Sequence, residues 1–195
     1  MKRVKLLIVI LLVLSTVSAQ NCWIKGLGDG TYASSNKGFV AVGGKYVLLL
    51  DNRLLCMNGN GIVEWSQDID LFNPTKLDST ADGNIMLTGH RITGNEPGNL
   101  NPRTIHMGAL LKIGLDGRLQ WEKNFPPDSL LLSTVESVTQ TASGGFLIGL
   151  YEYNSMGQIK YELLLLNNNG AVQQRKLILP YYVHSFTQSA NGYLL

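Results

Sequence analysis

Two stretches decide the fold: Thr80–Gly89, which reads TADGNIMLTG, and Thr141–Gly149, which reads TASGGFLIG. In each, a polar turn that contains glycine leads into a run of β-branched, aromatic, Leu and Met residues, which is typical of a turn followed by a β-strand. Residues 189–195 (SANGYLL) are a third copy, and residues 36–43 (NKGFVAVG) are a weaker one. The chain is therefore a repeat of strands and turns.

A second motif follows each copy. It consists of an apolar strand, a turn that ends in Asn-Gly or Asp-Gly, two further residues, then Glu or Gln, then Trp or Gln, and it spans residues 47–65, 109–121 and 162–174. Asn-Gly and Asp-Gly tolerate the positive φ angles of a type I′ turn, so we expect two strands to fold back on each other at each site. The turn glycines are Gly61, Gly117 and Gly170 in this motif, and Gly83, Gly144 and Gly192 in the first motif.

Trp65 and Trp121 occupy the same place in the second motif, and Gln174 takes that place in the third copy. A tryptophan can stack on a sugar, but a contact between neighbouring units must recur in each unit, whereas a ligand contact need not. We therefore interpret the two tryptophans as packing residues.

The repeat predicts an all-β chain, because a period of about 40 to 50 residues built only of strands and turns is the signature of propeller blades. We expect strands near residues 39–43, 46–50, 84–90, 107–113, 118–123 and 145–152, and a fourth strand of the second unit at 131–139. After a connecting segment at 20–33, the blade-like units fall at about 34–78, 79–139 and 140–187, and the next begins at 188–195.

This arrangement is a partial β-propeller of three four-stranded blades and the start of a fourth. Closed rings contain about 4 to 8 blades, so three and a fraction do not close one. We interpret the chain as an incomplete propeller that comes from a truncated gene, an interrupted reading frame or an incomplete sequence; the alternative is an arc that associates with itself.

Residues 1–19 have the pattern of a secretory signal peptide. Lys2, Arg3 and Lys5 precede the apolar run Leu6–Leu14, and small residues at Val17–Ala19 supply a cleavage site. An uncleaved anchor is the alternative, but a membrane span takes about 20 apolar residues. We expect a secreted chain, in the periplasm or at the cell surface, with no membrane span after cleavage.

Secretion makes a disulfide possible between Cys22 and Cys56, the two cysteines of the chain. Two free thiols are the alternative, as is a lipid on Cys22. Two cysteines and three histidines do not supply a four-thiolate zinc site. The net charge of +2 is too small for an electrostatic nucleic-acid binder, and 45% hydrophobic residues exclude a disordered tail.

No catalytic, cofactor-binding or metal site is predicted. Asp68 and Asp70 could place two carboxylates on one side of an extended segment, but we interpret them as loop residues. Residues 56–61 resemble a calcium loop but lack the acidic residues that such a loop requires, so we interpret them as a hairpin turn. His90, His106 and His184 are expected to be scattered, solvated or hydrogen-bonded histidines.

With both motifs in view, the sequence resembles the repeats of secreted bacterial β-propeller proteins, with the pattern TxDGGYxLxG followed by LLKxDxxGxxxWxK. Residues 80–89 and 110–123 carry the resemblance, Gln174 departs from it, and it extends over residues 34–195. These repeats are remotely similar to the quinoprotein-alcohol-dehydrogenase-like propellers.

The resemblance implies a secreted or cell-surface module without catalytic activity, which is part of a larger protein and binds an unknown protein or glycan. One alternative is a non-functional remnant of a longer propeller protein. The other is a fragment of a quinoprotein-like enzyme, for which we identify no cofactor-stacking residues and no calcium ligands.

Overall fold

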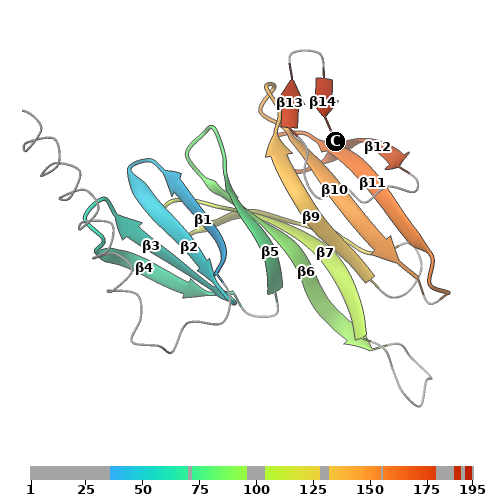
Figure 1. The fold of residues 1–195 in the computed structure, drawn as a ribbon, viewed down its shortest axis with the longest axis horizontal. Coiled ribbons are helices and arrows are strands. Elements are labelled where there is room, and N and C mark those ends of the chain that lie inside the picture. Colours follow the sequence, from blue (N-terminus) through green and yellow to red (C-terminus); the bar gives the residue numbers. More distant parts are fainter. Residues whose placement is uncertain are drawn as a thin grey trace, which may run out of the picture. The chain divides into compact units, whose positions relative to one another are not determined.

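The structure is a computed structural model that describes residues 36–69, 72–95, 104–127, 132–154, 156–178, 187–189 and 192–194. Every described element is a β-strand (Figure 1), so the expected all-β class is confirmed. The expected leader, the connecting segment at 20–33, Cys22, Asp70 and His184 lie outside the described residues. In the part of the chain that the structure covers, no helix has the length and apolar character needed to cross a bilayer.

Three runs of four antiparallel strands, which we call units, follow one another along the chain, within one compact body of residues 36–195. The first unit is a sheet of its own, whereas one parallel pair between β7 and β9 joins the second and third units into an eight-stranded sheet. The first unit contains β1 (Asn36–Val42), β2 (Lys45–Leu50), β3 (Arg53–Asn58) and β4 (Val63–Asp68). The second contains β5 (Phe72–Ser79), β6 (Ile85–Asn95), β7 (Thr104–Ile113) and β8 (Leu119–Phe125). The third contains β9 (Leu132–Gln140), β10 (Phe146–Tyr153), β11 (Ile159–Leu166) and β12 (Val172–Ile178), and the short strands β13 (Thr187–Ser189) and β14 (Gly192–Leu194) pair after it.

The six strands expected from the motifs are confirmed, but the place of one further strand was wrong. Residues 131–139 were expected to end the second unit, whereas β9 pairs with β10 along its length, from Gln140↔Phe146 to Leu132↔Tyr153. Its backbone link to the second unit is the parallel pair His106↔Leu132.

The turn at Thr80–Gly83 therefore joins the first two strands of a unit and does not lie between units. The hydrogen-bonded units begin one strand earlier than expected, at β5 and β9. For the same reason the weak copy at residues 36–43 is mostly β1, and the equivalent turn follows it at Gly43–Gly44.

The hairpin turns that were expected to be type I′ have a different geometry. At Asn58 the backbone carbonyl accepts from Gly61 N at 3.0 Å, and Asn58 N donates to Ile62 O at 3.0 Å. The glycines alone have positive φ, with 80° at Gly61, 82° at Gly117 and 78° at Gly170. This is a type I turn followed by a left-handed glycine, the usual three-residue hairpin loop.

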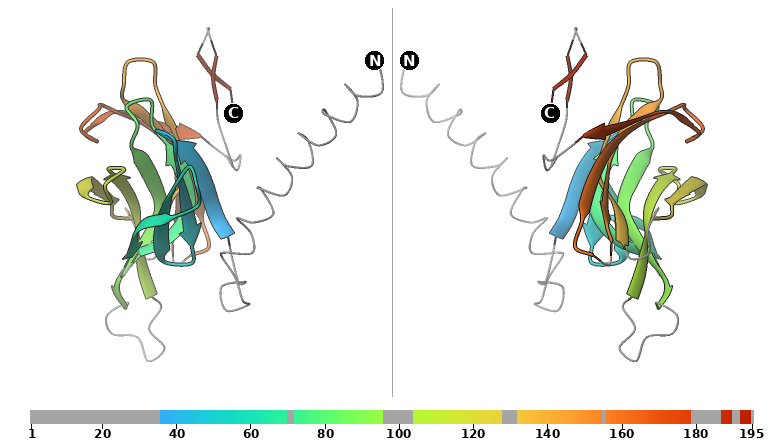
Figure 2. Two further views of the ribbon diagram at one scale, coloured as in Figure 1. Left: turned by 90° about the vertical axis from the view of Figure 1, so that its left-hand side faces the viewer. Right: turned by 90° about the vertical axis from the view of Figure 1, so that its right-hand side faces the viewer.

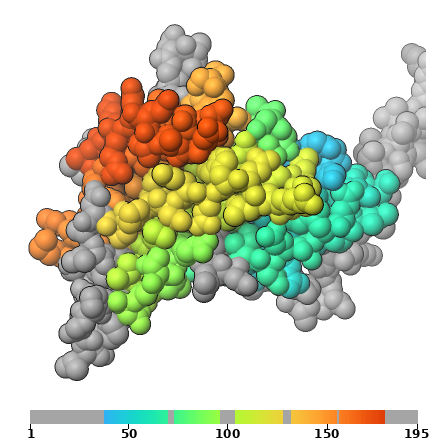
Figure 3. Space-filling view, turned by 180° about the vertical axis from the view of Figure 1, so that it is seen from behind, coloured from blue at the N-terminus to red at the C-terminus, as the bar shows by residue number. Residues whose placement is uncertain are grey.

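The units stack face to face, and the second unit is buried on both sides. Side chains alternate along a strand, so neighbours point to opposite faces. Ile85 and Leu87 belong to the core cluster shared with the first unit, whereas Met86 belongs to the cluster shared with the third. In the space-filling view of Figure 3, β7 and β8 (yellow) lie between residues of the third unit (orange) and of the first (teal).

One contact recurs at both junctions between units. The Trp65 ring of β4 lies against Gly117, where an added Cβ would come within 3.2 Å of it, and Trp65 Nε1 donates to Leu115 O at 2.8 Å. The Trp121 ring of β8 lies against Gly170 in the same way, also at 3.2 Å. Each tryptophan therefore packs on the left-handed glycine of the next unit, at the place that Gln174 takes in β12.

Candidate functional site

The hairpin of β6 and β7 is longer than its counterparts. These strands have 11 and 10 residues, whereas β10 and β11 have 8 each. Their pairing continues to Asn95↔Thr104, so the hairpin extends beyond the neighbouring strands (Figures 1 and 2). Residues 93–95 continue β6 beyond the strand expected at 84–90, and β6 is exposed from Ile92 onward. We call residues 91–95 and 104–107 the long hairpin.

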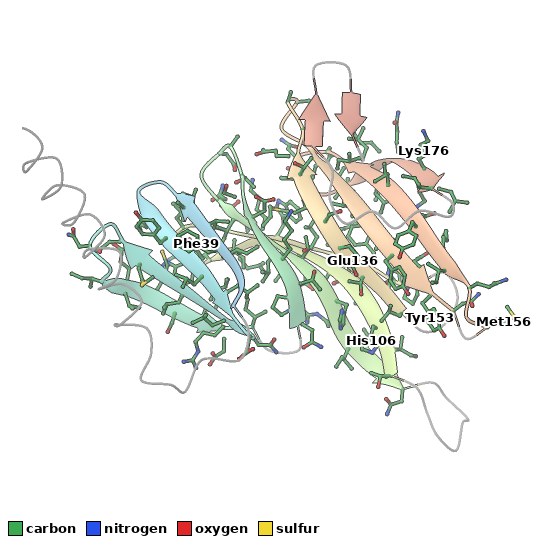
Figure 4. All side chains as sticks on the ribbon, in the orientation of Figure 1. Phe39, His106, Glu136, Tyr153, Met156 and Lys176 are labelled. Atoms are coloured by element: carbon green, nitrogen blue, oxygen red, sulfur yellow. The ribbon has the colours of Figure 1, made fainter. Side chains whose placement is uncertain are left out.

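Two histidines meet at the base of the long hairpin. The rings of His90 on β6 and His106 on β7 have centroids 4.7 Å apart in an edge-to-face arrangement, and Figure 4 labels His106 there. His90 Nδ1 lies 3.2 Å from the Thr134 hydroxyl of β9. The expectation of scattered histidines was wrong for this pair, because the register pairs Gly108 with His90 and places His106 next on the same face.

The histidine pair is partly buried, and so is the threonine beside it. Burial lowers the pKa of His106, and its Nδ1 atom is buried without a hydrogen-bond partner. Thr134 is 4% exposed, so its hydroxyl is closed to a substrate. Within the described ranges, no three His, Cys, Asp or Glu side chains gather as a metal site would require. The pair therefore fits a packing role between β6, β7 and β9.

Three consecutive residues of β9, Ser133–Val135, tie the third unit to the second, and we call them the β9 seam. Gly108 N donates to Ser133 Oγ at 2.7 Å, and Ser133 Oγ donates to Phe125 O. Thr75 Oγ1 donates to Val135 O at 3.1 Å. Backbone groups of β7, β8 and β9 are thus satisfied by side chains from the opposing unit.

Two buried carboxylates lie on the same face of the third unit. Lys160 Nζ is 3.0 Å from both Glu152 Oε2 and Glu162 Oε1, and Arg175 is 3.0 Å from Glu162 Oε2. The side chains of Glu152 and Glu162 are 7% and 5% exposed. The four charges cancel, so the network presents no net charge to a ligand.

A related ion pair occupies the equivalent positions of the second unit. Arg91 of β6 lies 3.0 Å from Glu122 of β8. Counted from the turn glycines, Arg91 takes the place of Glu152 and Glu122 the place of Arg175, so the signs are reversed. The charged positions recur in both units with exchanged signs. We therefore interpret both sets of ion pairs as structural contacts that hold the strands of a unit together.

The other residues considered from the sequence lie apart from the long hairpin. Asp68 is exposed and accepts from Arg53 Nε at 2.5 Å; this hydrogen bond lowers the pKa of Asp68. Cys56 is a free, buried thiol in the first core cluster, and burial raises its pKa. Gly192 opens β14 and pairs with Ser189.

Comparison with known proteins gives no family. No protein-family model matches the chain, and no curated protein matches it. A solved protein of unknown function from Bacteroides caccae is similar at 10% identity and a TM-score of 0.42, over 73% of this chain. The extracellular domain of a proposed one-component system from B. thetaiotaomicron is similar at 11% identity and a TM-score of 0.31, over 83% of this chain. The chain spans 60% and 29% of the lengths of these two proteins.

Proposed function

We propose that the chain is a β-propeller module, exported from the cytoplasm, that binds a protein or a glycan and carries no catalytic site. The observation behind this proposal is the contact of Trp65 with Gly117, repeated by Trp121 with Gly170. A contact that joins successive four-stranded units in the same way is what a propeller requires at each junction between blades.

Binding fits the described residues better than catalysis does. The hydroxyls of Ser133 and Thr134 are buried and hydrogen-bonded, and Glu152 and Glu162 are buried beside cations. The long hairpin, by contrast, presents an exposed extension of one unit. Extra residues in one repeat commonly lie on the binding face of a repeat protein.

Export is supported by the sequence of residues 1–19, where a positive segment precedes an apolar run and small residues. The ligand then lies outside the cytoplasm, where glycans and surface proteins are available.

The experiment is a binding screen of the exported chain on two arrays, one of glycans and one of peptides. The test variant replaces residues 93–105 with Asn-Gly, which joins the paired residues Ile92 and His106 through a two-residue turn. The control is Leu119→Ser, which changes a 51% exposed residue on β8. We expect a wild-type signal on one array that the shortened variant loses and the control keeps, with melting temperatures unchanged. A shortened variant that binds as the wild type does, or silence on both arrays, would overturn the proposal.

A further inference from the structure

The two histidines at the base of the long hairpin lie at the junction between the second and third units. His90 shares a face of β6 with Met86, which belongs to the core cluster that the second unit forms with the third. His106 shares a face of β7 with Leu110, which belongs to the same cluster. His90 also reaches β9, since its Nδ1 atom lies 3.2 Å from the Thr134 hydroxyl. Strands of both units therefore surround the pair.

The surroundings of the pair suit one positive charge and disfavour two. A charge on His90 is met by an oxygen, because the Thr134 hydroxyl can accept from a protonated Nδ1 atom. His106 has no such group at its Nδ1 atom, which is buried without a hydrogen-bond partner. The ring centroids are 4.7 Å apart, so a proton on one ring lowers the pKa of the other. A second proton therefore costs the pair both desolvation and like-charge repulsion.

The charged side chains on the strands around the pair leave this cost in place. Four ion pairs take up most of them: Arg91 with Glu122, Lys112 with Asp82, Lys76 with Asp78, and Glu152 with Lys160. Lys123 of β8 lies on the face of the pair, because it is paired with Leu110, and it carries the same sign as a protonated histidine. Glu136 is the bulge residue of β9 (Figure 4), where burial and then the charges of Tyr153 and Glu136 raise the pKa of Tyr151. Burial, and none of these charges, lowers the pKa of His106.

Opening the junction removes both costs. The β9 seam reaches β7 beside the pair, where Gly108 N donates to Ser133 Oγ at 2.7 Å, two residues along the strand from His106. When β9 separates from β7, both rings meet water and the pKa of each returns toward its ordinary value of about 6.5. Below that pH the open junction binds more protons than the closed one, so acid favours opening.

We propose that the histidine pair makes the junction between the second and third units acid-sensitive, so that the β9 seam opens as the pair takes up its second proton. The pKa of His106 is lowered in the closed junction, so its contribution to stability is complete above about pH 6.5 and is lost as the pH falls below that value. The junction between the first and second units has no histidine among the described residues, so it stays closed over the same range. The inference goes beyond the proposed binding function and does not depend on the ligand.

Hydrogen exchange of the exported chain, followed by NMR between about pH 7.5 and about pH 5, tests the proposal. The protection of the Gly108 amide, corrected for the intrinsic exchange rate, should fall below about pH 6.5 with a slope that approaches about tenfold per pH unit, because opening takes up one proton. The Trp65 Nε1–H, which donates to Leu115 O at the other junction, should keep its protection.

Two variants separate titration of the pair from its packing. His106→Gln keeps a polar side chain that takes up no proton in this range, so the protection of the Gly108 amide should no longer change with pH. His90→Gln removes the neighbouring charge and leaves His106 to titrate. The pKa of His106, read from its ring resonances, should then rise toward about 6.5, and the loss of protection in acid should shrink. A packing role alone would leave that pKa where it is.

Three results would overturn the proposal: equal protection of the Gly108 amide at both ends of the pH range in the wild type, a loss in acid that persists in His106→Gln, or an equal loss at Trp65. The wild-type titration decides the question by itself if a variant does not fold. The array screen for a ligand is read separately, so an acid-insensitive junction would refute this inference and leave the binding function standing.

Discussion

Two buried serines on β9 give a direct test of how the third unit is attached. Ser133 is 0% exposed, and its hydroxyl bonds to the backbone of Gly108 and of Phe125. Ser137 is 1% exposed, and its hydroxyl is buried without a partner. The side chains have equal size and equal burial, so Ser→Ala at the two sites differs mainly in the hydrogen bonds that are lost.

The expected free energies of unfolding follow from this difference. Ser133→Ala leaves a buried N–H and a buried C=O unpaired, at about 1 to 3 kcal/mol for each group, so we expect a loss of about 2 to 6 kcal/mol. Ser137→Ala removes a hydroxyl that already lacks a partner, so we expect no loss or a gain of up to about 1 kcal/mol.

Urea unfolding followed by tryptophan fluorescence measures both variants. The denaturation midpoint should fall for Ser133→Ala and stay or rise for Ser137→Ala, with equal slopes. Hydrogen exchange should show that the loss for Ser133→Ala concentrates where β7, β8 and β9 meet. Equal midpoints for the two variants would refute the claim that the β9 seam holds the units together.

Three further predictions concern the junctions and turns. Gly170→Ala should destabilise the chain by about 1 to 2 kcal/mol more than Gly144→Ala in urea unfolding, because both glycines are left-handed but a tryptophan ring lies against Gly170 alone; equal losses would contradict this. Trp65→Phe keeps an aromatic ring and removes the Nε1–H donor, so the free energy of unfolding should fall by about 1 kcal/mol, which the same titration measures. Burial alone would raise the pKa of Asp82, but its hydrogen bonds with Lys112, Thr80 and Asn84 and the charge of Lys112 together outweigh burial and lower the pKa to about 2. Its contribution, about 1 kcal/mol after allowance for its half-exposed side chain, is present above pH 4 and is lost as the pH falls toward 2; Asp82→Asn should remove this part of the acid dependence of the melting temperature.

The strands and turns could be predicted because they are encoded locally. Apolar runs between glycine turns determine where a strand begins and ends, and the six expected strands follow this rule. The turn type was harder to predict from the sequence, because Asn-Gly suits both a type I′ turn and a type I turn with a left-handed glycine. The three-residue length of the loop decides between them, and it depends on strand register.

The grouping of strands into units could not be read from the same pattern. The turn at Thr80–Gly83 has the same sequence whether it joins two strands of one unit or two units, so β9 was assigned to the wrong unit. The unit to which β9 belongs is determined by contacts between residues far apart in the sequence, such as the hydrogen bond between Ser133 and Gly108. The meeting of His90 and His106 depends likewise on the register of a hairpin whose loop is long.

The direction of the tryptophan contact has a consequence for how such chains evolve. At each of the two junctions, the earlier unit supplies a ring from its fourth strand and the later unit receives it on the turn between its third and fourth strands, so both junctions use the same pair of surfaces. Duplicating or deleting the second unit leaves each remaining ring opposite a glycine. The number of units can therefore change in a single genetic step without a new interface having to arise, and the long hairpin of one unit can diverge while the junctions stay the same.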